Sequence, residues 1–104
     1  MEDGKKQYLY MLRLKPSLAQ GEKWTEAEEK AVEEHFQRLE KLLEEGTLIM
    51  AGRTQTMDEK TFGIVILETE TEEEAYVLME TDPAVAEGVM TAELFPYKVA
   101  LMRK

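Results

Sequence analysis

Few side chains in this 104-residue chain can move a proton or attack a bond. The sequence holds one histidine, His35, one serine, Ser17, and three aspartates, Asp3, Asp58 and Asp82, with no cysteine and no asparagine. The lack of cysteine excludes thiolate nucleophiles, disulfides and iron–sulfur sites, and one histidine cannot build a multi-histidine metal site within one chain. Ser17 lies outside any nucleophile-elbow pattern. Any catalysis must therefore use His35, a carboxylate, a lysine or a tyrosine.

His35 lies where helical periodicity predicts an apolar side chain. At about 100° per residue, it has nearly the same bearing as Ala31, Leu39 and Leu42. Two interpretations remain open. His35 is either a core histidine that hydrogen-bonds a carbonyl or a side chain, or a general acid or base that lines a pocket between helix and sheet.

Asp82 and two arginines are the other candidate site residues. Asp82 precedes Pro83, which is typical of an N-cap followed by the first residue of a helix. One oxygen of a capping carboxylate can hold a helix amide while the other accepts a proton from imidazole. Arg13 and Arg53 lie inside or just after predicted strands. Each could bind an anionic ligand or form a salt bridge at the rim of the fold.

The charge balance limits the classes of partner. Thirteen basic residues against 22 acidic residues give a net charge of −9, and no basic stripe interleaves with aromatics. This field repels phosphate backbones, and the longest apolar run is far too short to span a membrane. Residues 1–6 are not followed by a secretory apolar segment. We expect a soluble cytoplasmic protein with no nucleic-acid or membrane partner, formed by one domain over residues 1–104 with a flexible terminus at 1–6.

Local signals predict the elements that position these residues. Capping boxes at Thr25 and Thr71 predict helices that run to about Glu45, before Gly46, and to about Thr81. A polar loop is expected after the first strand, a short helix from Asp82 to Gly88, and an interruption of the last strand at Pro96. The predicted strands span residues 7–14, 48–51, 62–69 and 91–102.

The order of these elements predicts the fold class. A βαββαβ order is the ferredoxin-like α+β arrangement, in which two helices cover one face of a four-stranded antiparallel sheet. Residues 64–67 are apolar on both strand parities, yet two helices cover only one sheet face. An exposed apolar sheet face is unusual in a soluble monomer. We therefore expect a homodimer that packs through the open sheet face.

An ordered set of short motifs resembles a known family. The motifs are His35–Phe36, Leu39, Leu42, Glu44–Glu45–Gly46, Leu48–Ile49, Ala51–Gly52, Glu74–Ala75, Asp82–Pro83, Gly88 and Pro96–Tyr97. Together they resemble the pattern of YCII-related (YciI-like) domains over nearly the whole chain. The resemblance implies a dimeric α/β barrel of ferredoxin-like protomers, and it pairs His35 with Asp82 in the family's active site. Some members of that family are similar to lyases or dehydrochlorinases that act on small ring compounds.

Two hypotheses of function follow. In the first, the protein is a lyase or isomerase that needs no cofactor or metal. Asp82 accepts the Nδ1 proton of His35, the other ring nitrogen moves a proton on a small organic molecule, and Arg53 or Arg13 holds an anionic group. In the second, the protein is a non-catalytic homodimeric module in which His35 and Asp82 bind a small ligand or brace the fold.

Overall fold

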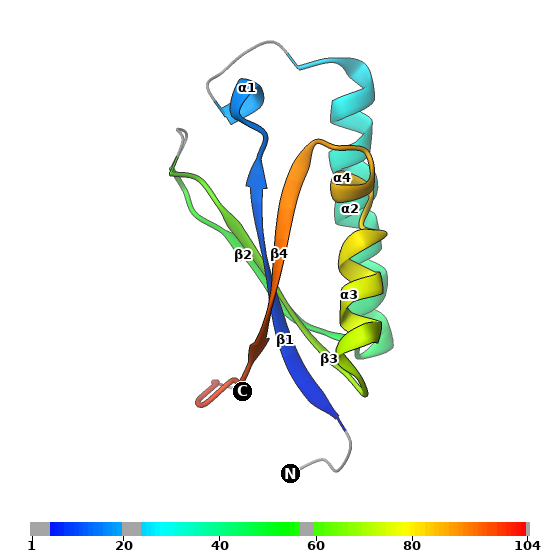
Figure 1. Ribbon diagram of the computed structural model, residues 1–104, viewed down its shortest axis with the longest axis vertical. Coiled ribbons are helices and arrows are strands. Elements are labelled where there is room, and N and C mark those ends of the chain that lie inside the picture. Colours follow the sequence, from blue (N-terminus) through cyan, green and yellow to red (C-terminus); the bar gives the residue numbers. More distant parts are fainter. Residues whose placement is uncertain (1–4, 20–23, 57–59, 104) are drawn as a thin grey trace.

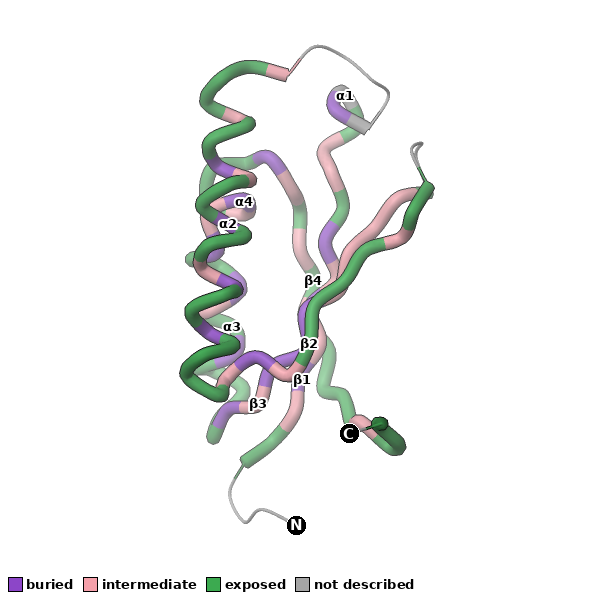
Figure 2. Tube along the Cα trace, turned by 180° about the vertical axis from the view of Figure 1, so that it is seen from behind, coloured by how far each residue is buried: buried purple, intermediate pink, exposed green. Residues whose placement is uncertain are grey.

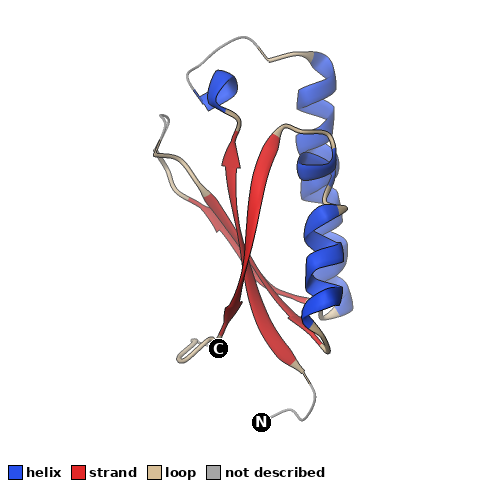
Figure 3. Ribbon diagram, in the orientation of Figure 1, coloured by secondary structure: helices blue, strands red, loops and turns tan. Residues whose placement is uncertain are grey.

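The computed structural model describes residues 5–19, 24–56 and 60–103. Figure 1 and Figure 3 show one long sheet with its main helices stacked along one side. Along the chain the elements are β1 (Lys6–Leu14), α1 (Pro16–Ala19), α2 (Glu26–Glu45), β2 (Leu48–Arg53), β3 (Gly63–Thr69), α3 (Glu72–Glu80), α4 (Pro83–Ala86) and β4 (Met90–Tyr97).

The sheet has the topology that the order of elements predicts. Its four antiparallel strands lie in the order β2-β3-β1-β4, so β1 and β3 are central. Helices α2, α3 and α4 cover one face, and no helix of the described residues covers the other (Figure 1). The ferredoxin-like α+β fold is confirmed. None of the described helices is long and apolar enough to cross a membrane.

The predicted helix ends are confirmed. The Thr25 side chain accepts a hydrogen bond from the Glu28 amide at 3.2 Å, and the Thr71 side chain accepts one from the Glu74 amide at 3.1 Å. Gly46 ends α2 with φ of 84°, a left-handed conformation in which a Cβ atom would be strained. These ends set the length of α2 and therefore which of its residues face the sheet.

The core lies between the sheet and the helices. Alternate residues of β1, namely Tyr8, Tyr10 and Leu12, are buried in this core. Figure 2 colours the trace by burial and shows buried stretches on α2 as well as in the sheet. They pack with Leu39, Leu42, Leu48, Val65, Leu67, Ala75 and Met79. His35 and Asp82 lie in the same layer, between the sheet and the helices.

The segment after β1 differs from its prediction as a polar loop. Residues Pro16–Ala19 form a short helix, α1, and Leu18 is buried against Ala31 and Val89. This second small cluster holds α1 near the first turns of α2. One leucine in a polar segment is therefore enough to fold it back on the domain, an effect that depends on partners far along the chain.

Two strand ends and part of the helix face also differ from expectation. β2 continues through Gly52 to Arg53, whereas β4 ends at Tyr97 rather than at residue 102. Tyr97 pairs with Gln7 near the start of β1, so little of that strand remains for later residues to pair with. Pro96 lies in the edge strand β4, where a missing amide proton is tolerated. Helical spacing places Phe36 on the same broad apolar half of α2 as Leu39 and Leu42, but its side chain is 61% exposed.

Candidate functional site

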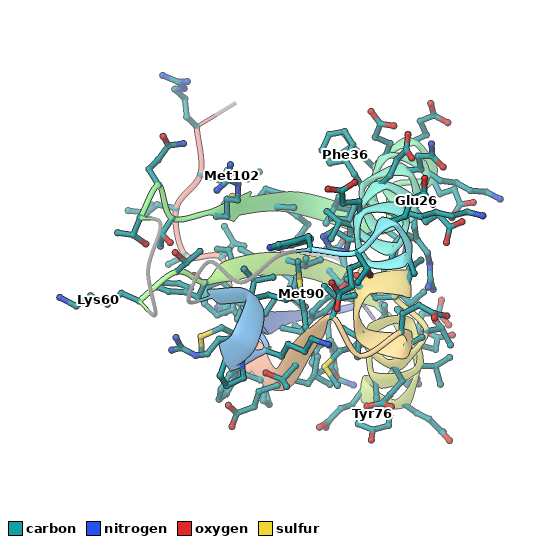
Figure 4. The ribbon with its side chains drawn as sticks, turned by 90° about the horizontal axis from the view of Figure 1, so that it is seen from above. Glu26, Phe36, Lys60, Tyr76, Met90 and Met102 are labelled. Atoms are coloured by element: carbon teal, nitrogen blue, oxygen red, sulfur yellow. The ribbon has the colours of Figure 1, made fainter. Side chains whose placement is uncertain are left out.

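A cavity of about 610 Å³ lies between α2 and the helix-facing side of the sheet. The β2 and β3 strands diverge from α2 toward their hairpin, and α1 lies above the gap in Figure 1. Figure 4 labels Phe36 beside α2 and Met90 between the sheet and the helices, and both residues line the cavity. The main apolar and aromatic walls come from Leu12, Leu39, Val65, Trp24, Phe36 and Phe62.

His35 and Asp82 meet at the inner wall of this cavity. The Nδ1 atom of His35 lies 2.7 Å from Oδ1 and 2.8 Å from Oδ2 of Asp82. His35 is 9% exposed and Asp82 is 1% exposed. His35 comes from the middle of α2, and Asp82 is the N-cap of α4. The two residues are 47 positions apart in sequence, so the packing of α4 against α2 creates the pair.

The Asp82 carboxylate has two further donors. Tyr10 donates its hydroxyl proton to Oδ2 at 2.7 Å, and the Ala84 amide donates to Oδ1 at 3.0 Å. The second contact is the helix cap that the sequence predicts. Both oxygens of the carboxylate are therefore held, and its plane is fixed by groups from β1, α2 and α4.

Burial keeps Tyr10 a proton donor. Desolvation raises the pKa of Tyr10 well above its usual value of 10.0, and the negative charge of Asp82 and the hydrogen bond to it raise this pKa further. A neutral Tyr10 can only donate to the carboxylate, and an ionised Asp82 can only accept. The proton of a neutral His35 therefore lies on Nδ1, because this nitrogen faces the carboxylate.

The second ring nitrogen of His35 is available to the cavity. No described residue hydrogen-bonds Nε2, and the described part of the chain has no fully buried side-chain polar atom that lacks a partner. Solvent therefore reaches Nε2, and His35 lines the cavity. An imidazole with a proton on Nδ1 presents an unprotonated Nε2, which can accept a proton from a bound molecule.

Two contributors to the site were missed from the sequence. The sequence alone predicts that Tyr10, like the other tyrosines, lies in the core or on a dimer face. A buried tyrosine hydroxyl usually needs a partner, and this requirement could have marked it. Arg38 lies one turn after His35 on α2 and donates to the carbonyl oxygen of Thr81, and at 2.8 Å to its hydroxyl. Because Thr81 precedes Asp82, Arg38 fixes the backbone that enters the cap.

The two arginines predicted to bind a ligand lie on different faces of the sheet. Arg53 lines the cavity, whereas Arg13 does not. A register irregularity between Leu48 and Met50 reverses the alternation along β2, which brings Arg53 to the cavity face. Arg13 pairs with Thr91 in the sheet, and its guanidinium lies 5.5 Å from the ring centroid of Phe62. Of the two arginines predicted to bind a ligand, Arg53 is therefore the one that faces the cavity.

Among the described residues, no group of three or more histidine, aspartate or glutamate side chains could hold a metal ion. Asp3 and Asp58 lie outside the described residues, as does the side chain of Ser17. The described polar side chains at the site are His35, Asp82, Tyr10 and Arg53, a set suited to proton transfer and anion binding.

Solved structures share this fold at low sequence identity. The 5-chloro-2-hydroxyhydroquinone dehydrochlorinase of Burkholderia phenoliruptrix, solved with 2,5-dihydroxybenzoquinone, aligns with a TM-score of 0.58 and 18% identity over 88% of this chain and 93% of that chain. An uncharacterised protein of Thermotoga maritima aligns with a TM-score of 0.56 and 13% identity over 90% and 99% of the two chains. These likenesses establish the fold alone.

Comparison with curated proteins found no match. The profile of the YCII-related domain matches residues 7–98. This range includes all four helices and all four strands of the described residues, except the first residue of β1. The match also includes His35, Asp82, Tyr10 and Arg53. On this evidence of sequence and fold, the chain belongs to the YCII-related domain family.

Proposed function

We propose that this protein is an enzyme that moves a proton on a small organic molecule, in a reaction of the lyase or isomerase type. His35 is the general acid and base, Asp82 holds its tautomer, and Arg53 binds an anionic group of the substrate. The observation that supports this most directly is the orientation of His35, whose Nδ1 lies 2.7 Å from Asp82 while the ring lines a cavity.

The chemistry of the pair limits the reaction class. In the forward step, Nε2 of His35 takes a proton from carbon or oxygen of the substrate, and the charge that develops on the imidazolium is balanced by Asp82. The proton then returns to another atom of the same molecule, or leaves with a departing group. General acid–base catalysis contributes about 10²- to 10⁴-fold, which suits substrates with activated C–H bonds.

Proton exchange tests this proposal without knowledge of the natural substrate. Cyclic ketones, lactones and hydroxyquinones, each with and without a carboxylate, would be incubated with the protein in D₂O, and loss of their acidic C–H signals would be followed by NMR. We expect exchange with at least one class, and a fall of about 10²-fold or more in His35→Gln. Glu40→Gln, which changes an exposed side chain on the same helix, is the control and should exchange at the wild-type rate.

The alternative function is a non-catalytic ligand-binding or structural module. The observation that favours it is that one carboxylate links β1, α2 and α4, which a structural brace would also do. If no panel member exchanges and His35→Gln lowers the free energy of unfolding by a few kcal/mol, the brace is the better account.

A second copy of the chain is the proposed partner. The sheet face opposite the helices presents Leu9, Met11 and Ile64 at its centre, with Met50 and Phe95 exposed beside them. Such a face favours burial against a like face. The measurement is the mass in solution, and a chain of 12.0 kDa that stays monomeric at micromolar concentration would contradict it.

A further inference from the structure

The cavity has a polar end and an apolar interior. Arg53, Thr56 and Thr61 line the end formed by the β2–β3 hairpin, and the hydroxyls of the two threonines lie 3.1 Å apart. Two aromatic residues from separate segments, Trp24 and Phe36, line the interior. Flat aromatic walls favour a flat apolar body, because ring faces and edges gain most from stacked or edge-on contact.

The charges that face the cavity differ from those of the whole chain. The protein carries 22 acidic residues and a net charge of −9. None of the described acidic residues lines the cavity, whereas Arg53 does. No described residue forms an ion pair with Arg53. An unpaired guanidinium beside apolar walls favours a carboxylate, whose two oxygens match its planar donors.

The sheet register gives the separation between Arg53 and Tyr10, and Tyr10 is linked to His35 through Asp82. Ala51, Val65 and Tyr10 lie in one row across β2, β3 and β1, and Arg53 lies two residues farther along β2. Two strand spacings of about 4.8 Å and a rise of about 6.8 Å place the Cα atoms of Tyr10 and Arg53 about 12 Å apart. The cavity volume of about 610 Å³ is large enough for one substituted ring.

A missing side chain leaves room for this ring. Gly63 pairs with Arg53 on one side and with Leu12 on the other, on the face that lines the cavity. A Cβ atom at Gly63 would lie 3.3 Å from the carbonyl oxygen of Gly52, and any larger side chain would extend over the cavity floor. The floor between the apolar interior and Arg53 is therefore backbone.

We propose that the cavity binds a planar ring compound that bears a carboxylate. The carboxylate pairs with Arg53, the ring lies beside Trp24 and Phe36, and the opposite ring edge faces Nε2 of His35. This inference rests on the proposed function, since it names the substrate class of the same site. It excludes acyclic acids and neutral rings as good ligands.

Benzoate, benzamide and acetate separate the contributions of ring and charge. Each would be titrated into the protein by calorimetry and by NMR, in which the only imidazole, that of His35, reports binding. We expect saturable binding of benzoate that shifts the His35 signal, and at least tenfold weaker binding of benzamide and acetate. Arg53→Gln should weaken benzoate roughly ten- to hundredfold and leave benzamide unchanged. Arg103→Gln, which removes an equal charge outside the cavity lining, should leave all three unchanged.

Three results would overturn the inference. They are no saturable benzoate binding, equal affinity for benzoate and benzamide, and a benzoate affinity that changes less than twofold in Arg53→Gln. Failure of the proposed chemistry has a different signature. In that case His35→Gln leaves proton exchange unchanged or exchange is never seen, while benzoate still binds and still depends on Arg53.

Discussion

Replacing Tyr10 with phenylalanine tests whether a neutral buried hydroxyl holds the Asp82 carboxylate. The substitution removes a 2.7 Å hydrogen bond to Oδ2 and changes little else, because the ring remains within the core cluster. Hydrogen bonds to charged groups contribute about 1.5–3 kcal/mol. Oδ2 keeps His35 Nδ1 as a donor at 2.8 Å. We therefore expect Tyr10→Phe to lower the free energy of unfolding by about 1.5 kcal/mol at pH 7, the low end of that range.

The raised pKa of Tyr10 predicts how the difference in unfolding free energy between wild type and Tyr10→Phe changes with pH. The pKa of Tyr10 is higher in the folded protein than its usual 10.0, because of burial and then the charge of Asp82. Its contribution to stability is therefore present below pH 10 and is lost as the pH rises further, when the unfolded chain releases the proton and the folded chain does not. At pH 11 this loss amounts to about 1.4 kcal/mol for one group, so the two proteins should have nearly equal stability.

Urea unfolding of both proteins from pH 7 to pH 11, at one fixed protomer concentration, measures this difference. The lysines and the remaining tyrosines are common to both proteins, so their titration largely cancels from the difference in unfolding free energy. Tyr8→Phe is the control at pH 7, because Tyr8 is buried on the same face of β1 and its hydroxyl does not bond Asp82. A difference between wild type and Tyr10→Phe that stays constant up to pH 11 would refute the reasoning.

Three further outcomes are expected. Asp82→Ala should lower the free energy of unfolding by roughly 3 kcal/mol. Asp82→Asn keeps an oxygen that can cap α4, so its loss of stability, measured by calorimetry, should be smaller. Equal losses in the two variants would contradict the capping role. Gly46→Ala should cost about 1 kcal/mol by urea unfolding because φ is 84°, whereas Gly52→Ala, with open space around its Cβ position, should not destabilise the fold. Met50→Glu on the open sheet face should shift the light-scattering mass from dimer to monomer, and Tyr76→Glu on α3 should not. If both variants leave the mass unchanged, the open face is not the interface.

Signals that act over a few residues could be predicted from the sequence. Both capping boxes, the left-handed Gly46 and the cap at Asp82 depend on bonds within four residues, and each is found where the pattern predicts it. The burial of His35 follows from helical spacing alone and is also confirmed. Contact between His35 and Asp82 could be expected only from the family resemblance, because nothing local relates residues 47 positions apart.

Features that depend on register and packing could not be predicted. Tyr10 reaches Asp82 across 72 positions, and Arg38 reaches Thr81 across 43. Strand alternation predicts on which face of the sheet Tyr10 lies, but not which helix residue its side chain contacts. Arg53 faces the cavity only because a register irregularity after Leu48 reverses the alternation of β2. A bulge adds one residue without a marked change in composition, so alternation read from a single sequence gives the wrong face beyond it.

The cap and the proposed catalytic dyad use the same carboxylate, which links the stability of a small element to the reactivity of the site. Helix α4 has four residues and is too short to be stable alone, so its position depends on Asp82 and on packing against α2. In return, the Ala84 amide fixes one oxygen of Asp82, and Arg38 fixes the backbone before it. His35 therefore meets a carboxylate whose orientation is set before any ligand binds. No reorganisation of the pair is needed when charge develops on the imidazole, which is the condition under which a buried dyad assists proton transfer.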